Sequence, residues 1–279
     1  MDILWFTILI WLGSLAAGFL GALTGLGGGV VIVPLLTLAF GADLRYAIGA
    51  SLVSVIATSS GAAAAYVREG YTNIRIGMFL EIATTCGALV GAFLAARVPA
   101  AAIAIVFGLF LFFSVYQSNR GGPDLSEHDD APDALAARLN LDSTYPTRDG
   151  ARSYHVHGVP AGFGLMFVAG GLSGLLGIGS GALKVLAMDR LMRIPFKVST
   201  TTSNFMIGVT AAASAGVYLN RGYVDPGLAM PVVLGVLPGS LLGARFLMRS
   251  STRLLRNIFS AVLVVVAIEM IYNGVTGRV

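Results

Sequence analysis

The stretch "LTGLGGGVVIVP", Leu23 to Pro34, places four glycines within five residues of an otherwise apolar segment. A glycine inside a helix costs about 1 kcal/mol relative to alanine. The hydrocarbon core of a bilayer leaves an unpaired backbone group unsatisfied, so irregular chain at membrane depth is buried in protein or lines a wet cavity. The stretch therefore predicts a membrane segment that is deliberately broken.

The composition is that of a polytopic membrane protein. The chain has 279 residues, of which 56% are hydrophobic and 11% charged, whereas soluble domains carry about 25% charged residues. Ile3–Leu23 and Ile258–Ile271 carry almost no charge, and about 20 apolar residues span a bilayer. The net charge of +4 therefore bears on membrane orientation and does not predict nucleic-acid binding. The N-terminal segment lacks a basic start and is expected to be retained, and the single Cys86 allows no intrachain disulfide.

The chain contains an internal repeat, which fixes its organisation. Adding 152 to a residue number superimposes the first part of the sequence on the second without a gap. Gly25, Gly27 and Gly29 then fall on Gly177, Gly179 and Gly181, while "TGLGGG" corresponds to "LGIGSG". Further matches include Ser51 with Ser203 and Thr58 with Thr210. We expect a first transmembrane repeat at 1–116, a polar linker at 117–157 and a second repeat at 158–279.

The linker is rich in proline, glycine and acidic residues, which predicts an extramembrane segment with a short helix around Ala131–Leu139. Because it is absent from the repeat, we expect deletion of Asp124–Pro146 to leave transport intact.

Each half is expected to contain one glycine-broken segment and three ordinary transmembrane helices. The broken segments are Ile3–Phe40 and Val159–Met192. The six ordinary spans are Leu44–Val67, Ile76–Ala96, Ala100–Tyr116, Val198–Leu219, Gly227–Met248 and Leu254–Tyr272. A broken segment either crosses fully, which gives two parallel repeats, or folds back as a re-entrant hairpin, which leaves three crossings per half and inverts the second repeat.

The loop charges favour the inverted arrangement. Full crossing places eight Lys and Arg residues on each face, whereas the re-entrant course places twelve on one face and four on the other. Those four are Arg45, Arg97, Arg221 and Arg278. By the positive-inside rule, the linker would be cytoplasmic and both termini extracytoplasmic. The choice depends on the four arginines of the linker, since without them both courses give eight against four.

The two glycine stretches are candidate anion sites. Each precedes a helix expected to begin near Val30 or Ala182. Backbone N–H groups at a helix start attract anions, and inverted-repeat transporters bind substrate at such interrupted helices. The alternative is close helix packing, which also selects glycine. A nucleotide-binding loop is excluded because neither stretch continues into Lys-Ser/Thr. "GALVG" at 87–91 and "GSLLG" at 239–243 are interpreted as packing sites only.

Lys184 stands in the first turn after the second glycine stretch, where the first half has Ile32. A lysine deep in a membrane costs about 3 kcal/mol on insertion scales and indicates function. The competing interpretation is that Lys184 reaches the interface or pairs with Asp189.

Hydroxyl groups follow both stretches and suit an oxyanion. "STTTSN" at 199–204 opens one helix, and Ser51 lies at the equivalent place in the other half. For any single hydroxyl, helix–helix hydrogen bonding is a strong alternative. The complete candidate site is Gly25, Gly27, Gly28, Gly29, Ser51, Gly177, Gly179, Ser180, Gly181, Lys184, Thr201, Thr202, Ser203 and Asn204.

Other charged residues give weaker indications. Glu81 could carry a coupling proton if it is buried. His155 and His157 match no zinc pattern, so no metal or other cofactor is expected. No catalytic arrangement lies at membrane depth, and the chain is not expected to be an enzyme.

The paired "GxGGG…P" and "GIGSG" motifs, each followed by a Ser/Thr-rich helix, resemble the TauE/SafE family of anion permeases. The resemblance covers Trp11–Val115 and Val159–Tyr272, with Leu186 standing where a copy of Pro34 would lie. It implies transport of sulfite or organosulfonates across the bacterial inner membrane.

Together these observations predict an all-α polytopic membrane protein with two inverted repeats that acts as a secondary transporter of small sulfur-containing anions. Its partners would be the anion, the lipid bilayer and a coupling proton or ion, with no nucleic acid. A passive anion channel and a non-transport membrane scaffold are the alternatives.

Overall fold

The computed structural model describes residues 3–24, 28–68, 70–119, 133–147, 150–247 and 252–277. The first half contains α1 (Ile3–Thr24), α2 (Gly29–Pro34), the π-helix η1 (Leu35–Ala39), α3 (Leu44–Arg68), α4 (Ile74–Ala95) and α5 (Ala100–Asn119). The linker forms α6 (Ala134–Arg138), β1 (Ser143–Thr147) and β2 (Gly150–Tyr154). The second half contains α7 (Val159–Leu176), α8 (Gly181–Leu186), the π-helix η3 (Ala187–Leu191), α9 (Phe196–Asn220), α10 (Pro226–Leu247) and α11 (Thr252–Thr276).

The elements of the two halves repeat with the offset found in the sequence. The helices α2, α3, α4 and α5 begin 152 residues before α8, α9, α10 and α11, respectively. Leu186 does not change the second half, because α8 continues into a π-helix as α2 does after Pro34. The helix starts at Gly29 and Gly181 lie within one residue of the predicted starts.

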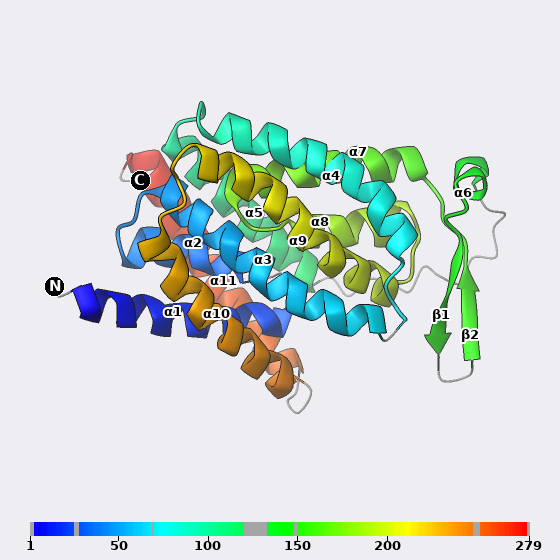
Figure 1. Cartoon of the computed structure of the whole chain (residues 1–279), viewed down its shortest axis with the longest axis horizontal. Helices are drawn as coiled ribbons and strands as arrows, with labels where there is room; N and C mark the ends of the chain where they lie inside the picture. The colour runs from blue at the N-terminus through cyan, green and yellow to red at the C-terminus, as the bar shows by residue number, and fades with distance from the viewer. Residues whose placement is uncertain are drawn as a thin grey trace.

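Each broken segment folds back on itself. The rings of Phe6 and Phe40, at the two ends of the first segment, meet edge to face with centroids 5.8 Å apart. In the second segment the His157 N–H donates to the carbonyl of Met192 at 3.1 Å. Both broken segments therefore have the shape of a hairpin. Figure 1 shows both termini at the left end of the bundle and the linker strands at the right end.

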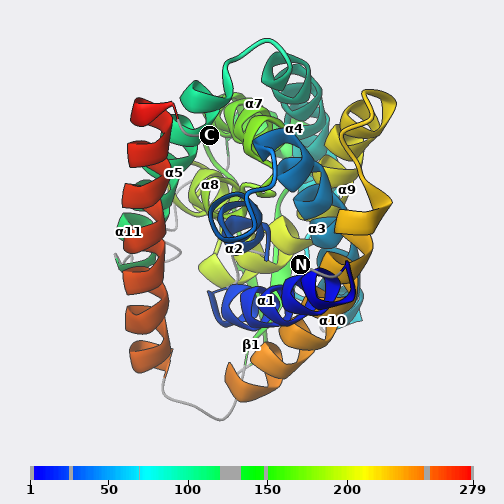
Figure 2. The same cartoon turned by 90° about the vertical axis from the view of Figure 1, so that its left-hand side faces the viewer.

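Helices of the first half pack against helices of the second half. α1 packs against α10 and α4 against α7, while α3 pairs with α9 and α5 with α11. Figure 2 shows α2 and α8 at the centre of the view with the longer helices around them. The broken helices thus occupy the middle of the molecule.

Glycines permit the closest of these helix crossings. A Cβ on Gly87 or Gly91 would collide with the backbone of α7, at Phe167 and Gly171. Gly239, the repeat partner of Gly87, meets the backbone of α1 at Leu15 in the same way. The packing interpretation of the "GALVG" and "GSLLG" motifs is confirmed at these three glycines.

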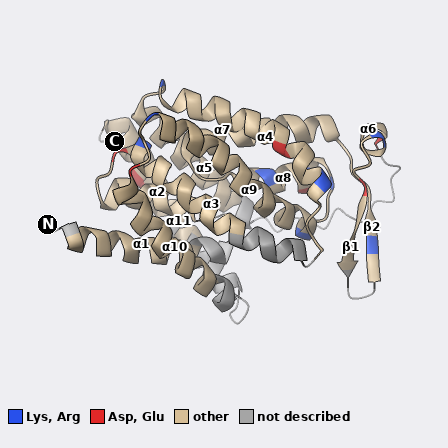
Figure 3. Cartoon of the chain, in the orientation of Figure 1, with Lys and Arg blue, Asp and Glu red and all other residues tan. Residues whose placement is uncertain are grey.

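Within the described residues, three helices are long and apolar enough to cross a membrane: Ile74–Ala95, Val159–Leu176 and Pro226–Gly243. Shorter apolar helices are Leu4–Leu20, Gly29–Ala39, Ala100–Tyr116 and Leu263–Thr276. α3 and α9 have 25 residues each, but hydroxyl and small residues lower their hydropathy. In Figure 3 most of the described charged residues lie toward the ends of the bundle or on the linker, while α8 carries a basic segment between those ends.

The linker corrects the expectation of an all-α chain. Its β1 and β2 pair antiparallel, with Ser143 opposite Tyr154 and Thr147 opposite Gly150. The predicted short helix is present as α6, within the range foreseen. The sequence reasoning missed the hairpin because proline and glycine dominate the segment and only a few residues alternate.

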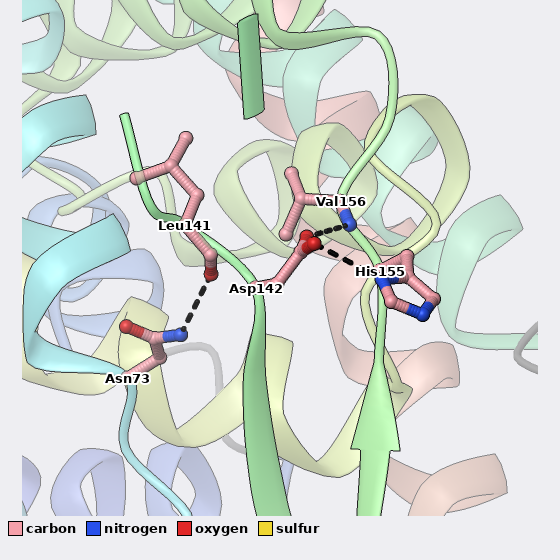
Figure 4. A network of polar contacts seen from close by, with 5 residues as sticks. All are labelled: Asn73, Leu141, Asp142, His155 and Val156. Carbon is pink, nitrogen blue, oxygen red and sulfur yellow. Dashed lines mark hydrogen bonds and ion pairs between the residues drawn. The ribbon is translucent and has the colours of Figure 1, made fainter. Parts of the chain in front are cut away.

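The linker is docked on the helical bundle by polar contacts (Figure 4). The amide nitrogen of Asn73, the residue that caps α4, donates to the Leu141 carbonyl at 3.5 Å. It also donates to the Tyr154 hydroxyl at 2.7 Å. Asp142 accepts from the Val156 N–H at 2.9 Å and lies 3.0 Å from the His155 ring nitrogen. Burial raises the pKa of the Tyr154 phenol above its usual value, so this hydroxyl stays protonated at neutral pH.

Apolar linker side chains complete a core with the start of α4 and the end of the second hairpin. Leu141 is 1% exposed and packs in a cluster that contains Ile76 and Met188. The linker is therefore not a free tether over this range. Deletion of Asp124–Pro146 would remove Leu141 and β1, so we now expect that deletion to destabilise the protein.

Leu141→Ala tests this docking. We expect a loss of about 2–5 kcal/mol in the free energy of unfolding, because a buried leucine leaves a cavity. Leu139→Ala, at a side chain 39% exposed, should change stability by about 0.5 kcal/mol or less. Equal effects of the two changes on thermal unfolding in detergent would contradict the docked linker.

Candidate functional site

The two glycine turns lie in contact at Ser51. The Ser51 hydroxyl donates to the Gly177 carbonyl at 2.7 Å, and the Gly29 carbonyl lies 3.5 Å from it. A Cβ on Gly29 would stand 2.8 Å from the Ser51 oxygen and 2.9 Å from the Gly177 carbonyl oxygen. Residues separated by 148 positions in the sequence thus meet through bare backbone, which is why Gly29 cannot be a larger residue.

Serines at equivalent positions of the two repeats contact the first residues of both short helices. Ser203, the counterpart of Ser51, lies 3.3 Å from the carbonyl of Gly181, the counterpart of Gly29. Gly179 also approaches this junction, because its Cβ would lie 2.9 Å from Ile207 on α9 and 3.3 Å from Val55 on α3. Each half therefore contributes one glycine turn and one serine to the same centre.

Neither short helix is capped by a side chain. Gly28 and Ser180 occupy the cap positions of α2 and α8 without a side-chain hydrogen bond. The first N–H groups of a helix have no partner within it, and they carry the positive end of the helix dipole. Two such ends are buried here near one another, where an anion would be attracted.

The second turn has an unusual backbone. Gly177 and Gly179 both have φ of +70°, and Ser180 has φ of +45°. Positive φ is ordinary for glycine but uncommon for serine. The Ser180 hydroxyl is buried, and among the described residues it has no hydrogen-bond partner. Ser180 therefore offers an unused polar atom beside the helix start.

Lys184 lies entirely inside the protein. Its side chain is 0% exposed, and its ammonium donates to the Thr210 hydroxyl at 2.6 Å. Thr210 in turn lies 2.7 Å from a carboxylate oxygen of Glu81, which also accepts from Thr85 at 3.1 Å. Lys184 does not reach the surface, and Asp189 instead pairs with Arg190 at 3.5 Å.

This lysine–threonine–glutamate link joins three separate elements, α8, α9 and α4. Thr210 was absent from the sequence-based site, although the repeat pairs it with Thr58. The signal that could have found it is the pair of buried opposite charges, Lys184 and Glu81, which require a polar connection at membrane depth.

Other predicted residues have different partners. Thr201 donates to carbonyls of its own helix, at Lys197 and Val198. Thr202 accepts from the Asn73 N–H at 3.0 Å, so its hydroxyl faces the start of α4. Asn204 is half-buried. Gly25 and Gly27 lie outside the described residues.

Among the residues that the structure describes, the remaining titratable side chains form no metal site. Over the described part of the chain, no group of three His, Cys, Asp or Glu side chains could hold a metal ion. Glu269 lies on α11, where it lines an open pocket with Asp43 and Tyr272.

The contacts at the two glycine turns bring eight of the predicted site residues to one region: Gly28, Gly29, Ser51, Gly177, Gly179, Ser180, Gly181 and Ser203.

Comparisons with known proteins point to one family. Residues 10–270 match the family described as "Sulfite exporter TauE/SafE". The probable membrane transporter protein YunE of Bacillus subtilis is 30% identical over 280 residues, covering 97% of this chain and 98% of its own. YdhB of the same organism, also named a probable membrane transporter protein, is 26% identical over 86% of this chain and 88% of its own. The probable membrane transporter protein MJ0441 of Methanocaldococcus jannaschii is 25% identical over 91% of each chain. No solved structure gives a significant match.

Proposed function

The chain belongs to the TauE/SafE family, and we propose that it is a secondary transporter of a small sulfur-containing anion, sulfite or an organosulfonate, in the bacterial inner membrane. The observation that carries the proposal is the buried contact at Ser51 between Gly29, at the uncapped start of α2, and Gly177, in the turn that leads to the uncapped start of α8. Backbone N–H groups at such ends bind oxyanions without a fixed charge. An ion gradient or the gradient of the anion itself would drive transport.

The anion would bind between the two glycine turns. The N–H groups around Gly28, Gly29, Gly179 and Gly181 would face it, together with the hydroxyls of Ser51, Ser180 and Ser203. Lys184 would add a full positive charge, and Gly25, Gly27 and the polar side chains of Thr201, Thr202 and Asn204 complete the proposed region.

Binding would require the turns to separate. In this structure the only proton of the Ser51 hydroxyl is donated to the Gly177 carbonyl, so it is not free for an anion. Movement of one hairpin away from the other would release this proton and open space beside Gly29. Alternating access in inverted-repeat transporters moves one element set against another around a fixed site, which suits this junction.

The two repeats are proposed to be inverted across the membrane, with domains at 1–116 and 158–279 and the linker at 117–157 between them. Supporting this, the first segment joins Phe6 to Phe40 and the second joins His157 to Met192. In Figure 1, α1 runs from left to right and α7 from right to left. The excess of basic residues at the linker end favours a cytoplasmic linker with both termini outside.

Cysteine labelling tests this orientation in a Cys86→Ser background. We expect an impermeant maleimide to label Asn220→Cys in intact cells and to leave Ala151→Cys unlabelled, since these exposed residues lie at opposite ends of the bundle. Labelling of Ala151→Cys only after the membrane is opened is the matching positive result. Labelling of both, or of Ala151→Cys alone, in intact cells would rule out the proposed orientation.

Transport is tested with the purified protein in proteoliposomes. We expect radiolabelled sulfite or a sulfonate inside the vesicles to exchange for the same anion outside, with saturation, and acetate to compete poorly. Saturable counterflow separates a transporter from a passive channel, which would conduct without it. A membrane scaffold would give no flux with any anion of the panel.

A further inference from the structure

The buried carboxylate of Glu81 has a polar environment that a packing role does not require. Its side chain is 8% exposed. One carboxylate oxygen accepts from Thr85 and Thr210, whereas the other is buried and, among the described residues, has no hydrogen-bond partner. A buried ionised oxygen without a partner is costly, so this oxygen is a natural place for a proton.

Thr210 has one hydroxyl proton and two acceptors for it. Its oxygen lies 2.7 Å from Glu81 and 3.0 Å from the carbonyl of Met206, while it accepts from Lys184 at 2.6 Å. When Glu81 is ionised, the hydroxyl donates to the carboxylate, and Lys184 and Glu81 neutralise each other through it. When Glu81 is protonated, the hydroxyl is free to donate to Met206 and the positive charge of Lys184 is no longer balanced.

We propose that Glu81 is the binding site of a coupling proton, and that Thr210 makes the charge which Lys184 offers to the anion depend on that proton. The inference rests on the proposed function, because it needs an anion beside Lys184. When Glu81 is ionised, Lys184, Thr210 and Glu81 together carry no net charge. When Glu81 is protonated, the three residues together carry one positive charge. Proton and anion therefore favour each other's binding, and by linkage the effect is equal in both directions.

The step conserves charge and atoms. One proton enters from one side of the membrane and bonds to the free oxygen of Glu81, and one anion binds at the positive site. Both leave on the other side, where the O–H bond of Glu81 breaks and the Lys184–Thr210–Glu81 link reforms. For a monovalent anion, one proton per anion makes the cycle electroneutral.

Several other charged groups on the packed elements have partners of their own; on α4, Arg75 donates to the Asn140 carbonyl at 2.6 Å. α7 contains no titratable side chain over Val159–Leu176. On α9, Lys197 stands over the ring of Tyr71 at 3.8 Å and Tyr218 donates to the Gly174 carbonyl. On η3, Asp189 pairs with Arg190. At the linker end, Asn73 donates to Tyr154 and His155 lies against Asp142; His157 lies beside Met192, with both ring nitrogens lacking a partner among the described residues.

The test uses methanesulfonate, an anion that stays fully ionised near neutral pH, in proteoliposomes with wild type, Glu81→Gln and the control Glu269→Gln. The glutamine resembles a protonated Glu81. We expect wild type and Glu269→Gln to accumulate the anion when the outside is more acidic. We expect Glu81→Gln to keep exchange without a pH gradient but to lose this accumulation. The apparent affinity of wild type should weaken as the pH rises, and that of Glu81→Gln should not.

A measurement on the wild type alone keeps the inference testable if Glu81→Gln fails to fold. Binding of methanesulfonate to the purified protein in weak buffer should take up protons from solution, up to one per anion. Exchange by wild type with no proton uptake, or a Glu81→Gln protein that still follows the pH gradient, would overturn the inference and leave the proposed function standing. A wild type that neither binds nor exchanges any anion would overturn both.

Discussion

Lys184→Met is expected to reduce anion affinity by about tenfold to a hundredfold and to destabilise the protein at the same time. The first effect follows from the loss of a charge-assisted hydrogen bond, which contributes about 1.5–3 kcal/mol. The second follows because Lys184 balances Glu81 through Thr210 at a site with no exposure to water. Breaking a buried ion pair at one partner costs about 3–5 kcal/mol, since an uncompensated charge remains.

A second substitution separates these two effects. Lys184→Met combined with Glu81→Gln leaves no buried charge, so we expect thermal stability in detergent to recover while the anion affinity stays low. Lys184→Arg should restore affinity only in part, because a planar guanidinium differs from a compact ammonium. Lys197→Met is the matched control, since Lys197 is exposed. It should leave anion affinity unchanged, and the loss of its contact with the Tyr71 ring should cost about 1 kcal/mol or less.

The result that would remove Lys184 from the anion site is specific. If the double variant binds sulfite and methanesulfonate with wild-type affinity, the lysine serves only to balance Glu81. The proposed site would then consist of the two helix starts and the serine hydroxyls. Titration of thermal stability against anion concentration measures affinity and folding in the same sample.

The fold was largely predictable because its determinants are local and repeated. Apolar runs set the helices, and the glycines at 25–29 and 177–181 mark where two of them break. The offset of 152 residues then relates each element of one half to its counterpart, which propensity alone could not do. The linker was predicted less well, because the docking of Leu141 and Tyr154 depends on contacts with distant residues such as Asn73.

The candidate site was predictable only as far as the repeat reaches. Ser51 and Ser203 were proposed because they occupy equivalent positions in the repeat, and in the structure they contact the equivalent glycines Gly29 and Gly181. The link from Lys184 to Glu81 has no counterpart in the first half, where Ile32 replaces the lysine, so symmetry gave no indication of Thr210 as the connector. Thr202 was predicted as a ligand from the sequence, and in this structure its oxygen accepts a hydrogen bond from the N–H of Asn73, a contact set by how α9 lies against α4.

The second large effect is expected from Gly29→Ala, because Gly29 lies at the backbone contact between the two glycine turns. Gly29 lies at the start of α2, where helical geometry suits alanine and would normally favour it by about 1 kcal/mol. The added methyl would nevertheless stand 2.8 Å from both the Ser51 oxygen and Val55, and 2.9 Å from the Gly177 carbonyl oxygen. The Gly177 backbone cannot shift as easily as a flexible side chain could, so the two glycine turns must move apart. Overpacking of this kind costs about 1–3 kcal/mol.

We therefore expect Gly29→Ala to lower thermal stability and to reduce transport by at least about tenfold, because the helix starts proposed to bind the anion would be displaced. Gly164→Ala on α7 is the matched control, since its added methyl meets nothing within 4 Å, and it should leave transport unchanged. If both variants exchange sulfite at the wild-type rate, contact between the turns is not part of the transport cycle. If Gly29→Ala folds stably but loses exchange while Gly164→Ala keeps it, the loss of transport is due to the junction at Ser51. In that case Ser51→Ala, added to Gly29→Ala, should relieve part of the crowding and restore part of the stability.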